Sequence, residues 1–114
     1  MKQFLQTLET APDSITFDAT ISVIDANYDF TPSAFRNGEM RNEAGQNNGS
    51  CKVFSFARLH WLTPQQTLHC FGSYYRDDVL KYPQGSDHRN IRNFIKTGWD
   101  GIVFEGNALT LKKK

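Results

Sequence analysis

One short stretch decides the fold, and it runs Ser33-Ala34-Phe35-Arg36-Asn37-Gly38-Glu39-Met40-Arg41. At its centre stands Asn37-Gly38, the dipeptide that most readily supplies the positive φ angles of a two-residue type I′ turn. With these two residues as the turn, Arg36 faces Glu39 as a favourable charge pair. Phe35 then faces Met40 as an apolar pair. The stretch therefore predicts an antiparallel β-hairpin over residues 33–41.

A second hairpin is predicted nearer the end of the chain. There, Gly106-Asn107 is flanked by Ile102-Val103-Phe104-Glu105 and by Ala108-Leu109-Thr110-Leu111. Gly-Asn is also a two-residue turn sequence, and it would place Phe104 opposite Leu109. The apolar residues of both strands would then share one face. The prediction is a hairpin over residues 102–111.

The segments outside these stretches show the apolar spacing that is typical of amphipathic helices. We expect a first helix that ends near Thr10 and a second that is capped by Asp13 or Ser14. A third helix should begin near Ser50 and carry on one face Val53, Phe54, Ala57 and Trp61.

Two more helices are expected in the second half of the chain. Thr63-Pro64 is an N-cap followed by proline, and the helix that it starts is interrupted at Gly72. Asp87 can cap the fifth helix, which ends at Gly98. The expected fold is α+β, a single domain over residues 1–114 in which about five helices pack on a small antiparallel sheet built from the two hairpins.

Length and composition agree with one folded domain. The chain has 114 residues, and its 39% hydrophobic fraction excludes a disordered protein. No apolar run approaches the ~20 residues that cross a bilayer, so no membrane is expected. Thirteen basic and twelve acidic residues give a net charge of +1, which indicates no polyanionic partner. Nucleic-acid binding is not expected, although Arg89, Arg92 and Lys96 share one face of the fifth helix.

The cysteines and the first residues of the chain indicate the cellular compartment in which the protein is expected. Small secreted scaffolds usually carry more cysteines than Cys51 and Cys70. The N-terminus has no apolar stretch of signal-peptide length. We therefore expect two free thiols and a cytoplasmic protein.

A glycine-rich loop precedes the third helix and reads Gly45-Gln46-Asn47-Asn48-Gly49-Ser50-Cys51-Lys52. Free backbone N–H groups at a helix start suit a phosphate or a carboxylate. The loop is not a P-loop, because Gly49 is followed by Ser-Cys-Lys. Anion binding at residues 45–50 is one hypothesis, and a polar connection that caps the helix is the favoured interpretation of the loop.

Cys51 is the one candidate nucleophile in this loop, because the helix dipole and Lys52 favour its thiolate. A catalytic thiol also needs a histidine base, and His60 lies nine residues on, on the opposite side of the helix. A packed thiol beside Val53 and Phe54 is the favoured interpretation. His69-Cys70 do not have metal-ligand spacing, so neither a metal nor another cofactor is expected.

Two polar segments are richer in Asn, Asp and Glu than packing requires, and both flank the ends of predicted elements, where binding groups usually sit. The predicted ligand-binding residues are Asp25, Asn27, Asp29, Asn42, Glu43, Gln46, Asn47, Asn48 and Ser50.

Several motifs resemble the HopJ family across nearly the whole chain. They are residues 23–32, Phe35, Asn37-Gly38, residues 42–52, 70–72, 74–76, 87–94 and 96–99. The family name comes from a plant-pathogen protein described as a type III secretion effector, so the resemblance implies delivery by such a system. It implies no defined activity and assigns no catalytic residues. The first ten residues predict a helix and not the unstructured, serine-rich segment of a type III signal.

The sequence thus favours a HopJ-like domain that binds a protein partner or a small polar ligand without its own catalysis. A small thiol-dependent enzyme that uses Cys51 is the alternative, and a phosphate or anion binder at residues 45–50 is the third hypothesis. The oligomeric state and the identity of the ligand are left open.

Overall fold

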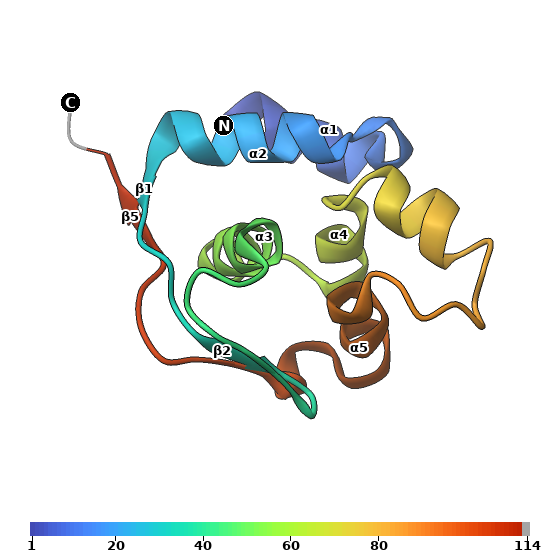
Figure 1. Ribbon diagram of the computed structural model, residues 1–114. Coiled ribbons are helices and arrows are strands. Elements are labelled where there is room, and N and C mark those ends of the chain that lie inside the picture. Colours follow the sequence, from blue (N-terminus) through green and yellow to red (C-terminus); the bar gives the residue numbers. More distant parts are fainter. Residues whose placement is uncertain (113–114) are drawn as a thin grey trace.

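The computed structural model describes residues 1–112 and has an α+β fold, as predicted (Figure 1). The helices are α1 (Lys2–Thr10), α2 (Phe17–Asn27), α3 (Asn48–Leu59), α4 (Pro64–His69) and α5 (Arg89–Thr97). Short 3₁₀ turns cover η1 (Pro12–Ser14) and η3 (Gly98–Gly101), and a π-helical turn forms η2 (Tyr74–Val79). The strands are β1 (Tyr28–Phe30), β2 (Phe35–Asn37), β3 (Met40–Asn42), β4 (Ile102–Phe104) and β5 (Leu109–Leu111). No helix within residues 1–112 has the length and apolar character needed to cross a membrane.

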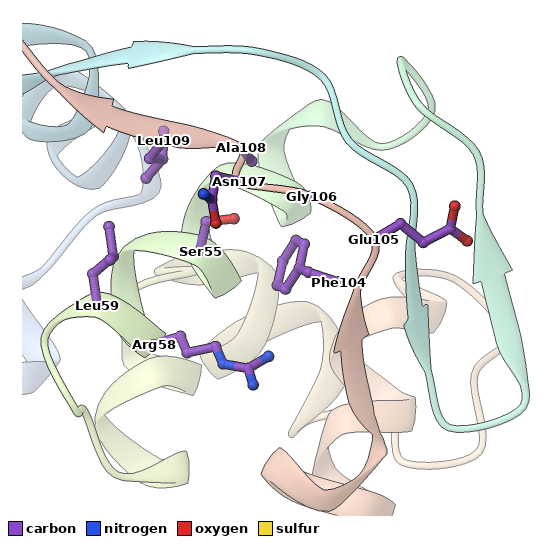
Figure 2. Close-up of a pocket in the computed structure, with 9 residues that line it drawn as sticks. All are labelled: Ser55, Arg58, Leu59, Phe104, Glu105, Gly106, Asn107, Ala108 and Leu109. Atoms are coloured by element: carbon purple, nitrogen blue, oxygen red, sulfur yellow. The ribbon is translucent and has the colours of Figure 1, made fainter.

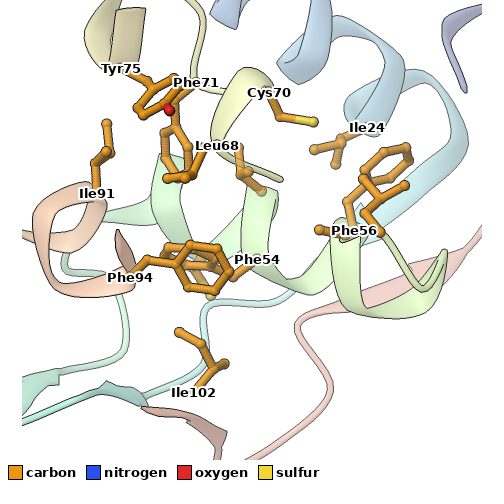
Figure 3. Close-up of a cluster of buried hydrophobic side chains, with 14 of the residues drawn as sticks. Ile24, Phe54, Phe56, Leu68, Cys70, Phe71, Tyr75, Ile91, Phe94 and Ile102 are labelled. Atoms are coloured by element: carbon orange, nitrogen blue, oxygen red, sulfur yellow. The ribbon is translucent and has the colours of Figure 1, made fainter. Parts of the chain in front are cut away.

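Helix α3 is the centre of the molecule. In Figure 1 it lies between α1 and α2 on one side, α4 and α5 on another, and the strands on a third. Nearly every residue from Cys51 to Ala57 on this helix is buried, as expected for a helix enclosed on all sides. The Phe54 ring contacts those of Phe35, Phe71 and Phe94, at centroid distances of 6.0, 5.4 and 5.0 Å. Figure 3 shows Phe54, Phe71 and Phe94 of this cluster among other buried side chains of the core.

The hairpin at residues 33–41 forms, but its turn is shifted by one residue. The pairs are Asn37 with Met40 and Arg36 with Arg41, so the turn residues are Gly38 and Glu39. Asn37 was predicted in the turn because of its tolerance of positive φ. It lies in β2 instead, where its side chain is fully buried and hydrogen-bonded to α5.

The prediction of a hairpin over 102–111 is wrong, and the strands form two sheets where one was expected. Strand β4 pairs with β2 and joins β3 in a three-stranded sheet, whereas β5 pairs with β1 in a two-stranded one. Gly106-Asn107 therefore does not turn the chain back on itself. Both strands find their partners in residues 28–37, where apolar side chains such as Phe35 can stack on Phe104.

The two sheets are the two ends of one long β-ladder, which we define as residues 27–38 running antiparallel to residues 101–112. Its register is the same in both sheets. Between the sheets, the Thr31 N–H donates to the Ala108 carbonyl at 2.8 Å, and the Glu105 N–H donates to Ala34 at 3.0 Å. Hydrogen bonds from Lys112 to Asn27 and from Gly38 to Gly101 close the two ends. The ladder curves around α3 (Figure 1).

The helix boundaries confirm some expectations and correct others. Helix α4 has the predicted Thr63 cap, as a full capping box with Gln66. Helix α2 is capped by Thr16, and not by Asp13 or Ser14, which lie in the preceding 3₁₀ turn.

Two further expectations are corrected and one is confirmed. Trp61 is not on the apolar face of α3: it follows the helix with a φ of 56° and is 92% exposed. Asp87 does not cap α5, because its carboxylate binds Arg92 instead. Gly98 ends α5 with a φ of 58°, as predicted.

Candidate functional site

Three buried asparagines connect the hairpin to the start of α5. Asn37, Asn42 and Asn90 are 0%, 0% and 5% exposed. The Asn37 amide donates to the Asn90 backbone carbonyl at 2.7 Å, and the Asn90 amide donates to Asn42 at 2.9 Å. Asn47, the residue before α3, donates to the same Asn42 oxygen at 2.7 Å. This asparagine network therefore fixes the first turns of α3 and α5 relative to each other.

A groove of about 670 Å³ lies where these two helices begin. We call it the α3–α5 groove. Its polar side is formed by Gly49 and Ser50 from α3 and by Arg89 and Asn90 from α5. Its apolar side is formed mainly by aromatic rings of Phe17, Phe71 and Tyr74.

Neither helix is capped by a side chain at this groove. The residues before α3 and α5, Asn47 and His88, both adopt left-handed conformations, with φ of 56° and 49°. Neither side chain accepts a hydrogen bond from its helix, and neither helix has an acidic residue in its first turn. Backbone N–H groups of a first turn have no intrahelical partner. The positive ends of both helix dipoles therefore lie at the α3–α5 groove.

Near the groove, a basic side chain adds to this positive potential and two carboxylates partly offset it. Arg89 is exposed and lines the groove. The imidazole of His88 lies 3.0 Å from the Asp78 carboxylate and stacks on Tyr74. The Asp87 carboxylate also lines the groove, but it accepts a hydrogen bond from Arg92 at 2.6 Å, and that bond lowers the pKa of Asp87.

The structure gathers part of the predicted binding set at this groove. Asn47 and Ser50 line it, and Asn42 lies in the network that joins Asn47 to Asn90. Asn48 is exposed at the first position of α3, and Gln46 accepts a hydrogen bond from the Glu43 N–H.

Other members of the predicted set lie apart from the groove. The Glu43 carboxylate pairs with Arg41, and that of Asp25 pairs with Lys52 at 2.8 Å. Asn27 hydrogen-bonds its own helix at Val23, and Asp29 is exposed on β1.

Sequence reasoning noted His88 and Arg89 only as basic residues of the fifth helix, and it did not join Asn37 and Asn90 to them in one constellation. The asparagines gave no signal, because Asn37 is typical of a turn and Asn90 of a solvated helix face. Only the pairing of β2 with β3 and the packing of α5 bring them together.

A second cavity, of about 480 Å³, lies between α3 and the middle of the long β-ladder (Figure 2). Ser55, Arg58 and Leu59 line it from the helix, and residues 104–109 line it from the opposite side. Within residues 1–112, no group of three or more His, Cys, Asp or Glu side chains is arranged to hold a metal ion.

The Cys51 thiol is buried at the start of α3 and lies in neither cavity. It is 1% exposed and donates a hydrogen bond to the Ser33 carbonyl at 3.5 Å. Burial raises its pKa, against smaller effects of Ser33 and Ser55. His60 is engaged with the Tyr28 hydroxyl at 2.8 Å. Cys51 therefore has the environment of a packed thiol.

Comparison with known proteins gives a family and a close structural relative. Residues 1–109 match the family described as HopJ type III effector protein. The crystal structure of a protein of unknown function, VPA0580, is similar with a TM-score of 0.97 and 54% sequence identity, over 98% of this chain and 93% of that one. No curated protein matches the chain. The motifs that resembled HopJ are thus confirmed by a match over most of the sequence, and the chain belongs to the HopJ type III effector family.

Proposed function

We propose that this HopJ family member is a non-catalytic binding domain whose ligand is a small polar molecule with a negative charge, held in the α3–α5 groove. One observation carries the proposal: two uncapped helix N-termini open into the same groove beside Arg89. Paired dipole ends and a guanidinium group favour phosphate or carboxylate. The aromatic side of the groove would contact the uncharged part of the ligand.

The position of the asparagine network supports this function. Buried amide networks hold neighbouring elements in one arrangement when their members are satisfied. Here the network joins the two helix starts before any ligand arrives, which lowers the cost of binding, although within residues 1–112 the Asn37 Oδ1 is buried without a partner. The Arg92 guanidinium donates a hydrogen bond to the Asp87 carboxylate at 2.6 Å and keeps that nearby carboxylate engaged with a cation.

The thiol-enzyme alternative has less support. Cys51 is buried and its pKa is raised, whereas a nucleophile needs an exposed thiolate with a lowered pKa. Both cysteines are free, which agrees with a reducing compartment, and we propose that the protein resides in the cytoplasm.

Titration with inorganic phosphate, followed by amide NMR shifts, tests the proposal. We expect saturable shifts of the Gly49, Ser50, Asn90 and Ile91 amides, with a dissociation constant on the order of millimolar for so small a probe. Arg89→Gln should weaken binding about tenfold. Lys96→Gln removes the same charge from the same helix outside the groove and should leave the affinity unchanged.

A second variant separates binding from folding. Ser50→Asp places a carboxylate in the first turn of α3, where the dipole stabilises it by about 0.5 kcal/mol. The protein should therefore keep or gain stability while losing phosphate binding. Absence of shifts at the four amides, or equal losses in the Arg89 and Lys96 variants, would exclude the groove as an anion site and leave a protein partner as the better hypothesis.

A further inference from the structure

A buried hydroxyl without a partner marks the second cavity, which we call the Ser55 pocket. Ser55 is 8% exposed, and within residues 1–112 its Oγ has no hydrogen-bond partner. It approaches the Cys51 thiol one turn earlier, but sulfur is only a weak partner. A buried hydroxyl is normally hydrogen-bonded. This one therefore has bonding capacity that the fold does not use.

The hydroxyl also differs from others in the helices of this chain. Helical hydroxyls usually bond the carbonyl four residues earlier when no other partner exists. Several threonines here do so, namely Thr7, Thr10, Thr20, Thr67 and Thr97. No such bond is formed by Ser55. In Figure 2 its side chain points from α3 toward Asn107.

Arg58 supplies a positive charge to the same pocket. It lies three residues after Ser55, on the same side of α3, and is exposed. Within residues 1–112, no carboxylate lies at ion-pair distance from it. Glu105 also lines the pocket, but its carboxylate pairs with Arg41 and points away from Arg58 in Figure 2. The guanidinium is thus left without a counter-ion.

The opposite wall offers backbone donors. Hydrogen bonds at Glu105 and Ala108 attach this segment to Ala34 and Thr31 on the opposite strand of the ladder, on either side of Gly106-Asn107. Within the described residues, the N–H groups of Gly106 and Asn107 themselves have no backbone partner. The Asn107 side chain lies over Ser55 in Figure 2, and it is exposed, so it can turn aside on a fast timescale.

We propose that the Ser55 pocket binds a small aliphatic carboxylate. The guanidinium of Arg58 would hold the carboxylate through paired N–H donors. The hydroxyl of Ser55 and the backbone N–H groups of Gly106-Asn107 would donate to the same group. Leu59, Phe104 and Leu109 provide apolar walls for a short hydrocarbon chain. The site is separate from the α3–α5 groove and does not depend on it.

Butyrate and its uncharged analogue butyramide test this proposal directly. We expect butyrate, at concentrations on the order of millimolar, to shift the amide signals of Ser55, Gly106 and Asn107 in a saturable manner, and butyramide not to do so. Arg58→Gln should weaken butyrate binding about tenfold. Lys96→Gln, which removes a charge outside the pocket, should have no effect.

Ser55→Ala separates a binding role from a structural one. The hydroxyl has only the weak Cys51 thiol as a partner to lose, so the variant should melt at about the same temperature as the parent or higher, yet bind butyrate several-fold more weakly. A lowered melting temperature with unchanged binding would show that Ser55 is structural and overturn the proposal. Equal shifts with butyramide, or unchanged binding in Arg58→Gln, would also overturn it. Phosphate binding in the α3–α5 groove is measured at other amides, so either proposal can be disproved without affecting the other.

Discussion

At the scale of single residues, the two cysteines are enclosed by protein. Cys51 is 1% exposed and Cys70 is 0% exposed. Loss of water disfavours a thiolate and raises the pKa of both groups, that of Cys70 to about 12, although Thr20 acts in the opposite direction. The folded protein therefore keeps both thiols protonated at a pH where the unfolded chain has begun to release them.

The free energy of unfolding is expected to fall as pH rises above about 8.5, where thiols of the unfolded chain ionise. Above that pH the unfolded state binds fewer protons than the folded state. Stability then decreases by up to about 1.4 kcal/mol per pH unit for each thiol. Urea unfolding with reductant at about pH 8 and about pH 10 measures the loss.

Cys70→Ala provides the control for this titration. It should lower stability at both pH values because it empties a packed position, yet the difference between the two should shrink. A stability that does not change over this range would contradict the assigned environment of the thiols. Rapid alkylation of native Cys51 below about pH 7 would contradict it as well and would favour the thiol enzyme.

At the scale of elements, Gly72 determines how α4 passes into η2. Its φ is 61°, and a Cβ built there would lie 2.6 Å from the backbone nitrogen of Phe17. Both the turn of the chain and the close approach of α2 therefore require glycine. The sequence predicted the break at Gly72 from local chemistry, but the contact with α2 is tertiary.

Gly72→Ala is expected to destabilise the protein by about 3 kcal/mol, because strain and the clash with Phe17 add together. Gly45→Ala is the matched control. Gly45 has a φ of 88°, and no atom lies within 4 Å of the point where a Cβ would stand, so only the strain of about 1 kcal/mol applies. Denaturant unfolding of both variants gives the comparison. Equal losses would mean that the contact with α2 contributes nothing.

Local signals predicted the elements well and their partners poorly. Helical spacing was sufficient to find the helices, because amphipathic faces are encoded locally, but of the predicted N-caps only Thr63 is confirmed. The Asn37-Gly38 turn was displaced by one residue, since burial of the Asn37 amide against Asn90 outweighed its turn preference. From the sequence, only Asn47 and Ser50 of the groove were predicted as binding residues. The residues of α5 reach the groove through tertiary packing, which local patterns do not encode.

At the scale of the whole molecule, the long β-ladder joins two segments that are distant in sequence. A Gly-Asn dipeptide was a reasonable hairpin signal, but it marks only the middle of an extended segment. The pairing that forms is one that tertiary packing supports, because Phe35 of β2 stacks on Phe104 of β4. Sequence patterns within 102–111 hold no information about that partner.

Hydrogen exchange distinguishes the ladder from the local hairpin. The amides of Thr31 and Glu105 should be protected because they donate across the ladder. The amides of Gly106 and Asn107, which have no backbone acceptor among the described residues, should exchange quickly. Exchange of Thr31 as fast as that of Gly106 would show that the two segments do not pair in solution.

The long β-ladder also bears on the order of events during protein synthesis. Residues 27–38 leave the ribosome early, whereas their partners at 101–112 are about seventy residues further along the chain, and closing such a loop is slow. Until then the nascent chain carries unpaired strand edges that can attach to other chains. The helices between the two segments can form meanwhile, and α3 then offers the apolar surface on which the late strand closes. The edge formed by residues 27–38 is therefore covered only after nearly the whole chain has been made.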